Sequence, residues 1–185
     1  ILEHNRDVVV IVDEAYIDFA GRSAIELIER YDNLVVTQTF SKARSMAGMR
    51  IGYAISNPKL IRYLNDVKYS FNSYTLNKVA LVCGEAAVKD QEYFENTVKK
   101  ITDTREKTKK ELADLGFSFT DSKANFIFAS HPEYDAKEMF DAMKEQGIYV
   151  RHWDSERISQ YLRITIGTEE EMQKLFEFLK KYMQK

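Results

Sequence analysis

Side chains that can do chemistry follow two strongly apolar runs of the sequence. Asp13 comes directly after the β-branched run at 8–12, with Tyr16 three residues on, and Lys42 closely follows a second apolar run at 34–37. Ligands of open parallel sheets bind beyond the carboxyl ends of the strands. We therefore expect a carboxylate, a phenol and an amine near one crevice, which are groups used in acid–base and nucleophilic chemistry.

Each of these side chains also has an ordinary structural interpretation. An Asp-Glu pair after a strand commonly starts a turn or caps a helix, and a single lysine after a strand is usually solvated. The combination is more specific than its members. Ser41 directly precedes Lys42, and Arg50 stands eight residues after it.

The apolar pattern predicts the elements that position these groups. The run at 8–12 fits a strand buried on both faces, and with a helical stretch at 25–30 and a strand at 34–37 it makes a strand–helix–strand unit. A third strand is expected at 50–55. Pro58 suits the first turn of the next helix.

The rest of the chain continues to mix helices and strands. Helical periodicity is present at 76–89, and a long, charged, solvated helix is expected at 92–115, where Gly116 is a suitable residue to end it. Thr168 and Glu171 have the spacing of a capping box at the start of the last helix. Between these helices we expect strands at 125–129, 148–150 and 161–166, and a helix over 136–143.

Composition excludes several classes of protein. The chain has 185 residues, of which 44% are hydrophobic and 30% charged, and its net charge of −2 is unlike that of a basic nucleic-acid-binding domain. No apolar run approaches the ~20 residues needed to cross a bilayer. Cys83 is the single cysteine, and His4, His131 and His152 lack metal-ligand spacing, so neither a disulfide nor a metal site is expected.

Three stretches of the sequence are specific enough to compare with a known family. They are TQTFSKA at 37–43, MAGMRIGY at 46–53 and YLRITIGT at 161–168. Together they resemble the histidinol-phosphate aminotransferase family, a group of fold-type I, class I/II aminotransferases that use pyridoxal 5′-phosphate. The resemblance covers essentially the whole chain and corresponds to about the C-terminal half of a family member.

The resemblance implies an α/β fold in three parts. Residues 1–90 would form the C-terminal part of the large pyridoxal-phosphate-binding domain, with a parallel or mixed sheet and helices. Residues 91–116 would be a long connecting helix, and residues 117–185 a small C-terminal α+β domain.

The resemblance also assigns cofactor roles to residues of this chain. Lys42 would form the Schiff base with the cofactor aldehyde and move a proton between substrate and cofactor. Asp13 would face the pyridine nitrogen and keep it protonated, and Tyr16 would donate to the phenolic oxygen. The cofactor phosphate would be held by Thr39, Ser41 and Arg50.

The substrate roles implied by the resemblance fall on two arginines. Arg163 and Arg151 would bind a phosphorylated amine in one half-reaction and a dicarboxylate in the other. The implied reaction is amino-group transfer between L-histidinol phosphate and 2-oxoglutarate, carried out for histidine biosynthesis by a cytoplasmic homodimer. The family's other cofactor residues lie in its N-terminal half. We therefore expect the 185-residue chain to be a truncated form that is inactive, or nearly so, by itself.

Other functions share much of this pattern. Another class I/II aminotransferase of the aromatic or aspartate type, or a threonine-phosphate decarboxylase, would carry the same Asp13, Tyr16, Lys42, Arg50 and Arg163. A non-catalytic pyridoxal-phosphate-binding regulatory module is an alternative outside enzymes. An α/β domain without a cofactor would leave the joint placement of these residues unexplained.

Overall fold

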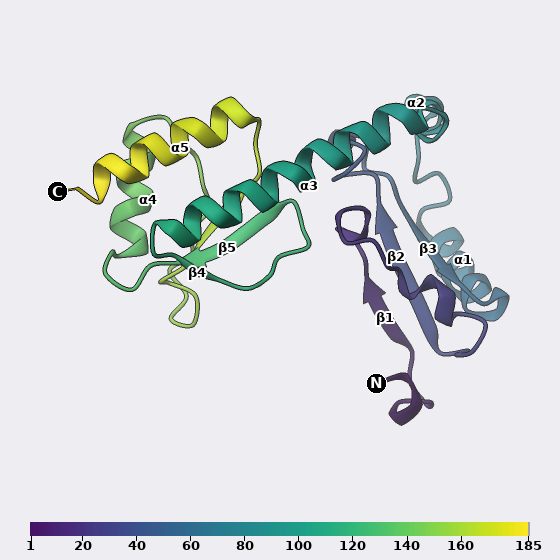
Figure 1. The fold of residues 1–185 in the computed structure, drawn as a ribbon. Helices are drawn as coiled ribbons and strands as arrows, with labels where there is room; N and C mark the ends of the chain where they lie inside the picture. Colours follow the sequence, from purple (N-terminus) through teal and green to yellow (C-terminus); the bar gives the residue numbers. More distant parts are fainter. Residues whose placement is uncertain (185) are drawn as a thin grey trace. The chain divides into compact units, whose positions relative to one another are not determined.

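The computed structural model describes residues 1–184 of the chain. They form two compact units, one from Ile1 to Asn96 and the other from Thr97 to the last of the described residues. The boundary falls within the long helix α3 (Gln91–Asp114), so this helix begins in the first unit and continues in the second (Figure 1).

The first unit is built on a mixed three-stranded sheet. Its strands are β1 (Val10–Asp13), β2 (Leu34–Thr39) and β3 (Gly52–Ser56), in the order β1-β2-β3. β1 and β2 are parallel, as predicted, whereas β3 is antiparallel to β2. The predicted helical stretch at 25–30 is instead a short 3-10 helix, Ala24–Leu27, which is capped by the Ser23 hydroxyl at Ile25 N.

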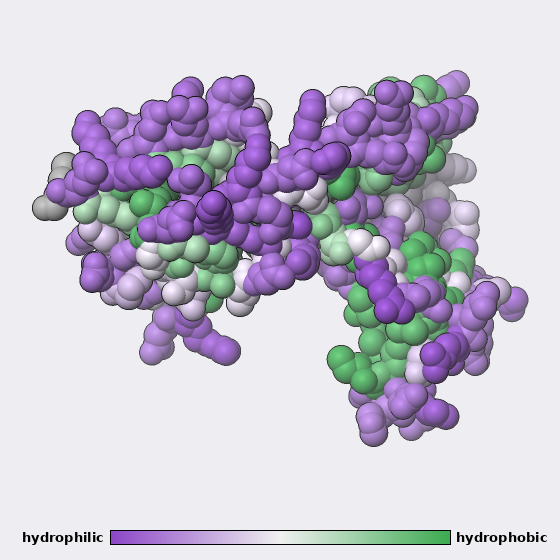
Figure 2. Space-filling view, in the orientation of Figure 1, coloured by the Kyte–Doolittle hydropathy of each residue, from purple (hydrophilic) through white to green (hydrophobic). Residues whose placement is uncertain are grey.

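Burial of β1 differs from the prediction. Val8, Val9 and Ile11 are 57%, 51% and 65% exposed, so the run at 8–12 is not buried on both faces. Within β1, the exposed Ile11 alternates with the half-buried Val10 and Val12, so only one face of the strand is covered. In addition, β1 is an edge strand that pairs only with β2. Figure 2 shows such apolar side chains, in green, at the surface of this unit.

Two helices come after the sheet of the first unit. α1 (Pro58–Phe71) begins at Asn57, whose side chain accepts hydrogen bonds from the backbone of Lys59 and Leu60. α2 (Lys78–Lys89) is capped by Asn77, whose side chain accepts a hydrogen bond from Ala80 N. Both helices also leave large apolar side chains exposed, among them Tyr63, Leu64, Val67, Val79, Leu81 and Val82.

The second unit packs three helices on one face of an antiparallel sheet. The sheet consists of β4 (Ser118–Phe119), β5 (Phe126–Ser130) and β6 (Leu162–Thr165), and it is covered by α3, α4 (Ala136–Glu145) and α5 (Glu169–Tyr182). The predicted capping box of Thr168 and Glu171 is present at the start of α5. The fully buried side chains at the centre of this core include Leu112, Ile127, Met139, Met143, Leu162, Ile164 and Leu179.

Two predictions in the second unit are wrong. No strand forms at 148–150, because Ile148 N donates to Met143 O and closes α4, which leaves only an isolated bridge between Arg151 and Arg163. The helix α3 is also less solvated than predicted. Arg105 is buried, as is Lys109, whose ammonium pairs with Glu106 and with an aspartate of the next loop.

Candidate functional site

A small cavity lies at one edge of the first unit's sheet. The carboxyl ends of β1 and β2 meet there because the two strands are parallel, and β3 starts there because it is antiparallel. The cavity measures about 370 Å³. Its lining consists of Asp13, Ala15, Thr37, Gln38, Thr39, Ser41, Lys42, Ala47 and Arg50. The structure thus brings five of the residues singled out in the sequence into one cavity.

The lysine and the tyrosine of the predicted set also lie together. The Lys42 ammonium is 5.2 Å from the centre of the Tyr16 ring, a cation–π distance. Asp13 accepts a hydrogen bond of 3.0 Å from the backbone of Ala15, which fixes the first turn after β1. The turn interpretation of Asp13 is therefore correct, and it coexists with a place in the cavity wall.

The hydroxyl groups of Thr39 and Ser41 form a connected pair. Thr39 Oγ1 lies 3.0 Å from Ser41 Oγ and accepts a hydrogen bond of 3.1 Å from Ser41 N. These contacts shape the turn between β2 and Lys42. The turn presents two adjacent hydroxyl groups to the cavity, and such groups can donate to an anion.

Arg50 has an unusual backbone conformation. Its φ of 56° is in the left-handed region, as is the φ of 55° at Ser45. Non-glycine residues are uncommon there, and they cluster at functional sites. The Arg50 guanidinium is exposed and donates a hydrogen bond of 2.8 Å to Ala47 O, which holds the side chain along the cavity-lining loop.

The loop at 41–51 is held in place by α2. Arg44 donates a hydrogen bond of 2.6 Å to Ala87 O, and its guanidinium lies 4.1 Å from the centre of the Phe94 ring. Gly84 of α2 packs against this loop, since a Cβ added there would lie 3.1 Å from Ile51 Cδ1. These contacts join the loop that carries Ser41, Lys42 and Arg50 to α2 and to Phe94.

Glu14 is a structural residue that the sequence interpretation did not single out. It is 8% exposed, and its carboxylate accepts hydrogen bonds from Ser23 Oγ (2.6 Å), Ala24 N (2.6 Å) and Gln38 Nε2 (2.8 Å). Strand alternation was the available signal, because it turns Glu14 away from Asp13. Glu14 thereby ties the end of β1 to Gln38 of β2.

Burial also changes the acidity of two side chains of the first unit. The pKa of Asp18 is raised, chiefly because the carboxyl group is partly buried, and the Arg44 guanidinium opposes this effect. The pKa of Tyr53 is raised by burial and by the charge of Asp18. The Tyr53 hydroxyl donates to Gln38 Oε1 at 2.6 Å, so it continues the network that begins at Glu14.

The two predicted substrate arginines are neighbours in the second unit. Arg151 N donates to Arg163 O at 3.1 Å, and Arg163 N donates to Arg151 O at 2.8 Å. Residues that oppose each other in an antiparallel bridge point to the same face. Both guanidinium groups also lie near the ring of Trp153, at 5.4 Å for Arg151 and 5.6 Å for Arg163.

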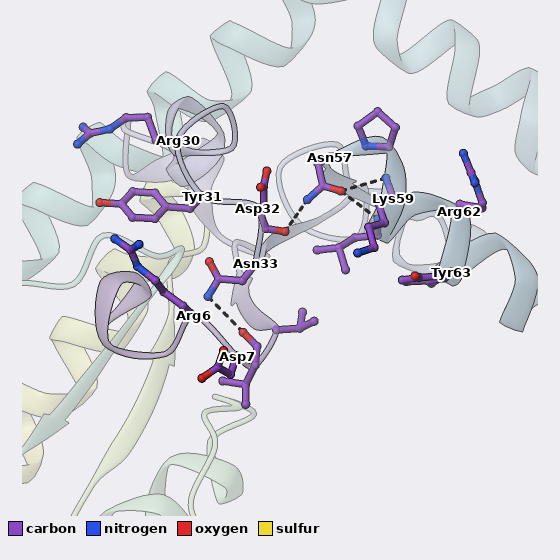
Figure 3. A pocket seen from close by; sticks show the side chains of 14 residues that line it. Arg6, Asp7, Arg30, Tyr31, Asp32, Asn33, Asn57, Lys59, Arg62 and Tyr63 are labelled. Carbon is purple, nitrogen blue, oxygen red and sulfur yellow. Dashed lines mark hydrogen bonds between the residues drawn. The ribbon is translucent and has the colours of Figure 1, made fainter.

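A larger cavity of the first unit lies elsewhere and contains none of the predicted site residues. It measures about 1060 Å³ and lies at the amino ends of β1 and β2. Figure 3 shows that Arg30 and Arg62 point away from each other, while the amide groups of Asn33 and Asn57 bind nearby backbone oxygens. Its basic groups do not converge on one point, so we place the candidate site at the smaller cavity.

Within residues 1–184, no helix is long and apolar enough to cross a membrane. The same residues contain no group of three or more His, Cys, Asp or Glu side chains placed to hold a metal ion.

The sequence matches the family described as aminotransferase class I and II over residues 1–179. The chain belongs to this family. Its relatives include the histidinol-phosphate aminotransferase of Lactococcus lactis subsp. cremoris, which is 52% identical over 183 residues, or 99% of this chain and 51% of the relative. The chain spans about half the length of the curated relatives it matches.

Solved structures of aminotransferases have the same fold. The histidinol-phosphate aminotransferase of Clostridium acetobutylicum superimposes with a TM-score of 0.89 and 25% identity, over 99% of this chain and 56% of that one. The histidinol-phosphate aminotransferase of Sinorhizobium meliloti, solved in complex with pyridoxal 5′-phosphate, superimposes with a TM-score of 0.81 and 27% identity, over 96% of this chain and 50% of that one. The predicted fold class is therefore confirmed.

Proposed function

We propose that a protein containing this chain transfers an amino group between L-histidinol phosphate and 2-oxoglutarate, with pyridoxal 5′-phosphate as cofactor. The observation that carries the proposal is the single cavity that contains Asp13, Thr39, Ser41, Lys42 and Arg50. The family to which the chain belongs supports amino-group transfer as the reaction class. The relatives at 52% identity support histidinol phosphate over aromatic, aspartate or threonine-phosphate substrates.

The chemistry of the cavity fits the proposed cofactor. When bound, pyridoxal phosphate supplies an aldehyde that condenses with amines and a ring that accepts electrons. Lys42 offers the amine, and the same nitrogen can hold or move the proton at the substrate carbon. The Asp13 carboxylate can keep a proton on the ring nitrogen, and the Tyr16 hydroxyl can donate to the phenolic oxygen. The phosphate would be held by Thr39, Ser41 and Arg50.

The two arginines of the second unit fit the proposed substrates. Histidinol phosphate and 2-oxoglutarate both carry anionic groups, and a guanidinium binds phosphate or carboxylate through two parallel hydrogen bonds. Arg151 and Arg163 are adjacent on one face. We assign them to the substrate's anionic groups.

The proposal extends to the organisation of the protein. We assign residues 1–90 to the large cofactor-binding domain, 91–116 to a connecting helix and 117–185 to the small domain. The cytoplasmic homodimer is carried over from the family resemblance. Because the chain spans half the length of its relatives, we expect it to be inactive without the remainder.

Cofactor trapping tests the proposal on this chain. Pyridoxal phosphate is titrated in, the adduct is reduced with borohydride, and the modified peptide is identified by mass spectrometry. We expect one adduct on Lys42, lost in Lys42→Ala and kept in the matched control Lys59→Ala. Adducts spread over many lysines, or none at Lys42, would argue against the assigned cofactor site.

The substrate is tested on a full-length protein that contains this sequence. Turnover of histidinol phosphate should exceed that of phenylalanine, aspartate and threonine phosphate when 2-oxoglutarate is the acceptor. Faster turnover of any of these competitors would replace the proposed substrate but would leave the cofactor site unchanged.

A further inference from the structure

The face of the second unit's sheet opposite the helices carries aromatic side chains. Along β5, Ile127 and Ala129 are fully buried beneath the helices, whereas Phe126 and Phe128 alternate with them and face the other way. Phe128 stacks on Tyr161 at a ring separation of 4.6 Å. The two arginines are on this face as well, because Arg163 pairs with Phe128 in the β5–β6 register.

The arginine pair is electrostatically unfavourable by itself. Arg151 and Arg163 oppose each other in the bridge, and like charges in directly opposed positions destabilise a sheet. Neither forms an ion pair with a carboxylate within the described part of the chain. Arg163 Nε is buried and has no hydrogen-bond partner among the described residues. The pair therefore presents unmatched positive charge and an unused donor.

Trp153 is the side chain that both guanidinium groups share. Each lies within the cation–π range of about 6 Å from the indole ring. The ring is supported by an edge-to-face contact with Phe128 at 6.1 Å. The preceding residue, His152, has a side chain only 5% exposed and bonds Ser159 O at 2.7 Å, which anchors the backbone beside Trp153.

We infer that Trp153 is a positioning residue that holds Arg151 and Arg163 together as one receptor for a doubly charged anion. The negative face of the indole ring offsets the repulsion between the guanidinium groups while no ligand is bound. A phosphate or a dicarboxylate can then bind both guanidinium groups at once, because they are already close together. The inference rests on the proposed function only for the identity of the anion, since the receptor itself is formed by residues of the second unit.

The chain carries its own reporter for this receptor. Trp153 is the single tryptophan of the sequence, so intrinsic tryptophan emission comes from this site alone. Titration with inorganic phosphate at constant ionic strength should change the emission saturably. We expect the change to be lost in Arg163→Gln and in Arg151→Gln. It should persist in Arg157→Gln, which removes an exposed arginine of the same segment. No saturable change in the unmodified chain would overturn the inference.

The role of the indole is tested by calorimetric measurement of phosphate affinity. Trp153→Leu keeps an apolar side chain but removes the ring, and loss of two cation–π contacts should weaken binding roughly fivefold to tenfold. Trp153→Phe keeps an aromatic face and should restore most of the affinity. Circular dichroism should show the same helix content and melting temperature in both variants.

The outcomes separate this inference from the proposed function. Equal phosphate affinity in Trp153→Leu and the unmodified chain, with loss in Arg163→Gln, would show that Trp153 is only a packing residue. Equal loss of phosphate affinity in Trp153→Leu and Trp153→Phe would also show that Trp153 is only a packing residue. A protein that traps pyridoxal phosphate on Lys42 but fails here would keep its proposed function and lose this inference.

Discussion

Asp121 shows how one exposed carboxylate can stabilise a buried ammonium. Lys109 of α3 is 9% exposed, and its ammonium lies 2.6 Å from Asp121 and 3.0 Å from Glu106. Hydrogen bonds from Lys109, and then from Lys123, lower the pKa of Asp121 from 3.8 to about 2. A buried ammonium without a partner is costly, so Asp121 secures the loop that leads from β4 into β5.

We predict that Asp121→Asn lowers the stability of the chain at neutral pH and changes its acid response. The folded protein favours the ionised carboxylate, so its contribution is complete above the unfolded pKa of 3.8 and is lost as the pH falls through about 2. Urea unfolding at several pH values should show that the unfolding free energies of Asp121→Asn and the unmodified chain converge as the pH falls from 3.8 to about 2. Asp114→Asn, at an exposed residue of α3, is the matched control. A gap that persists unchanged at the acid end of the window would contradict the assignment.

At the scale of the element, the pairing of β1 depends on Glu14, the residue directly after the strand. Five consecutive β-branched residues at 8–12 carry little information about register, because a shift by one residue would expose nearly the same side chains. The observed register sets Asp13 opposite Thr37. Glu14 fixes that register, since its backbone donates to Thr37 O at 2.8 Å and its carboxylate binds Gln38.

We predict that Glu14→Ala disorders the candidate cavity but keeps β1 paired with β2, because alanine retains the backbone bond from residue 14 to Thr37 O. Three donors lose their shared acceptor, which costs about 1–3 kcal/mol for a buried group left unsatisfied. Borohydride trapping should then modify Lys42 less selectively, although circular dichroism should still report the strands. Glu29→Ala, at an exposed glutamate of the same unit, should behave like the unmodified chain. Undiminished selectivity for Lys42 in Glu14→Ala would remove Glu14 from this role.

The starts of α1 and α5 could be predicted because their signals are local. Asn57 with Pro58 starts α1, and the pair Thr168 and Glu171 starts α5, as the sequence indicates. The absence of a strand at 148–150 and the exposure of β1 could not be predicted, because both depend on which distant segments supply hydrogen bonds or cover.

Some residues of the candidate site could likewise be predicted from the sequence, and others could not. Asp13, Lys42 and Arg50 stand near strand ends, so their meeting is a consequence of the strand pattern. Glu14 and Trp153 acquire their roles only through contacts with side chains that the fold brings to them. Periodicity contains no signal for such contacts.

At the scale of the whole molecule, the two units differ in how much they bury. The second unit has a continuous core in which Leu112, Ile127, Met139 and Leu179 are almost fully enclosed. In the first unit, β1 is at an exposed edge, and α1 and α2 leave large apolar side chains in solvent. Local stability increases with buried apolar contact, so the units should not open equally easily.

We predict slower amide hydrogen exchange in the second unit than in the first. Peptides that contain β5 and β6 should retain deuterium-free amides longest, and those that contain β1 should exchange early. Leu179→Ala should reduce protection in the second unit, since removal of a buried leucine costs about 2–5 kcal/mol. Leu81→Ala, at a residue 54% exposed, should change protection little. Stronger protection of β1 than of β5 would contradict the prediction.

Because the backbone of Arg50 is left-handed, selection for stable folding and selection for activity should favour different residues at position 50. Glycine adopts this conformation freely, whereas for an L-residue it costs roughly 1–2 kcal/mol. A mutant library screened only for folded protein should therefore enrich glycine at position 50. A library screened for growth that depends on the proposed aminotransferase activity should retain arginine, because the phosphate-binding role proposed for Arg50 requires its positive charge. The frequency of arginine at this position would then record whether a lineage has been selected for activity or only for folding.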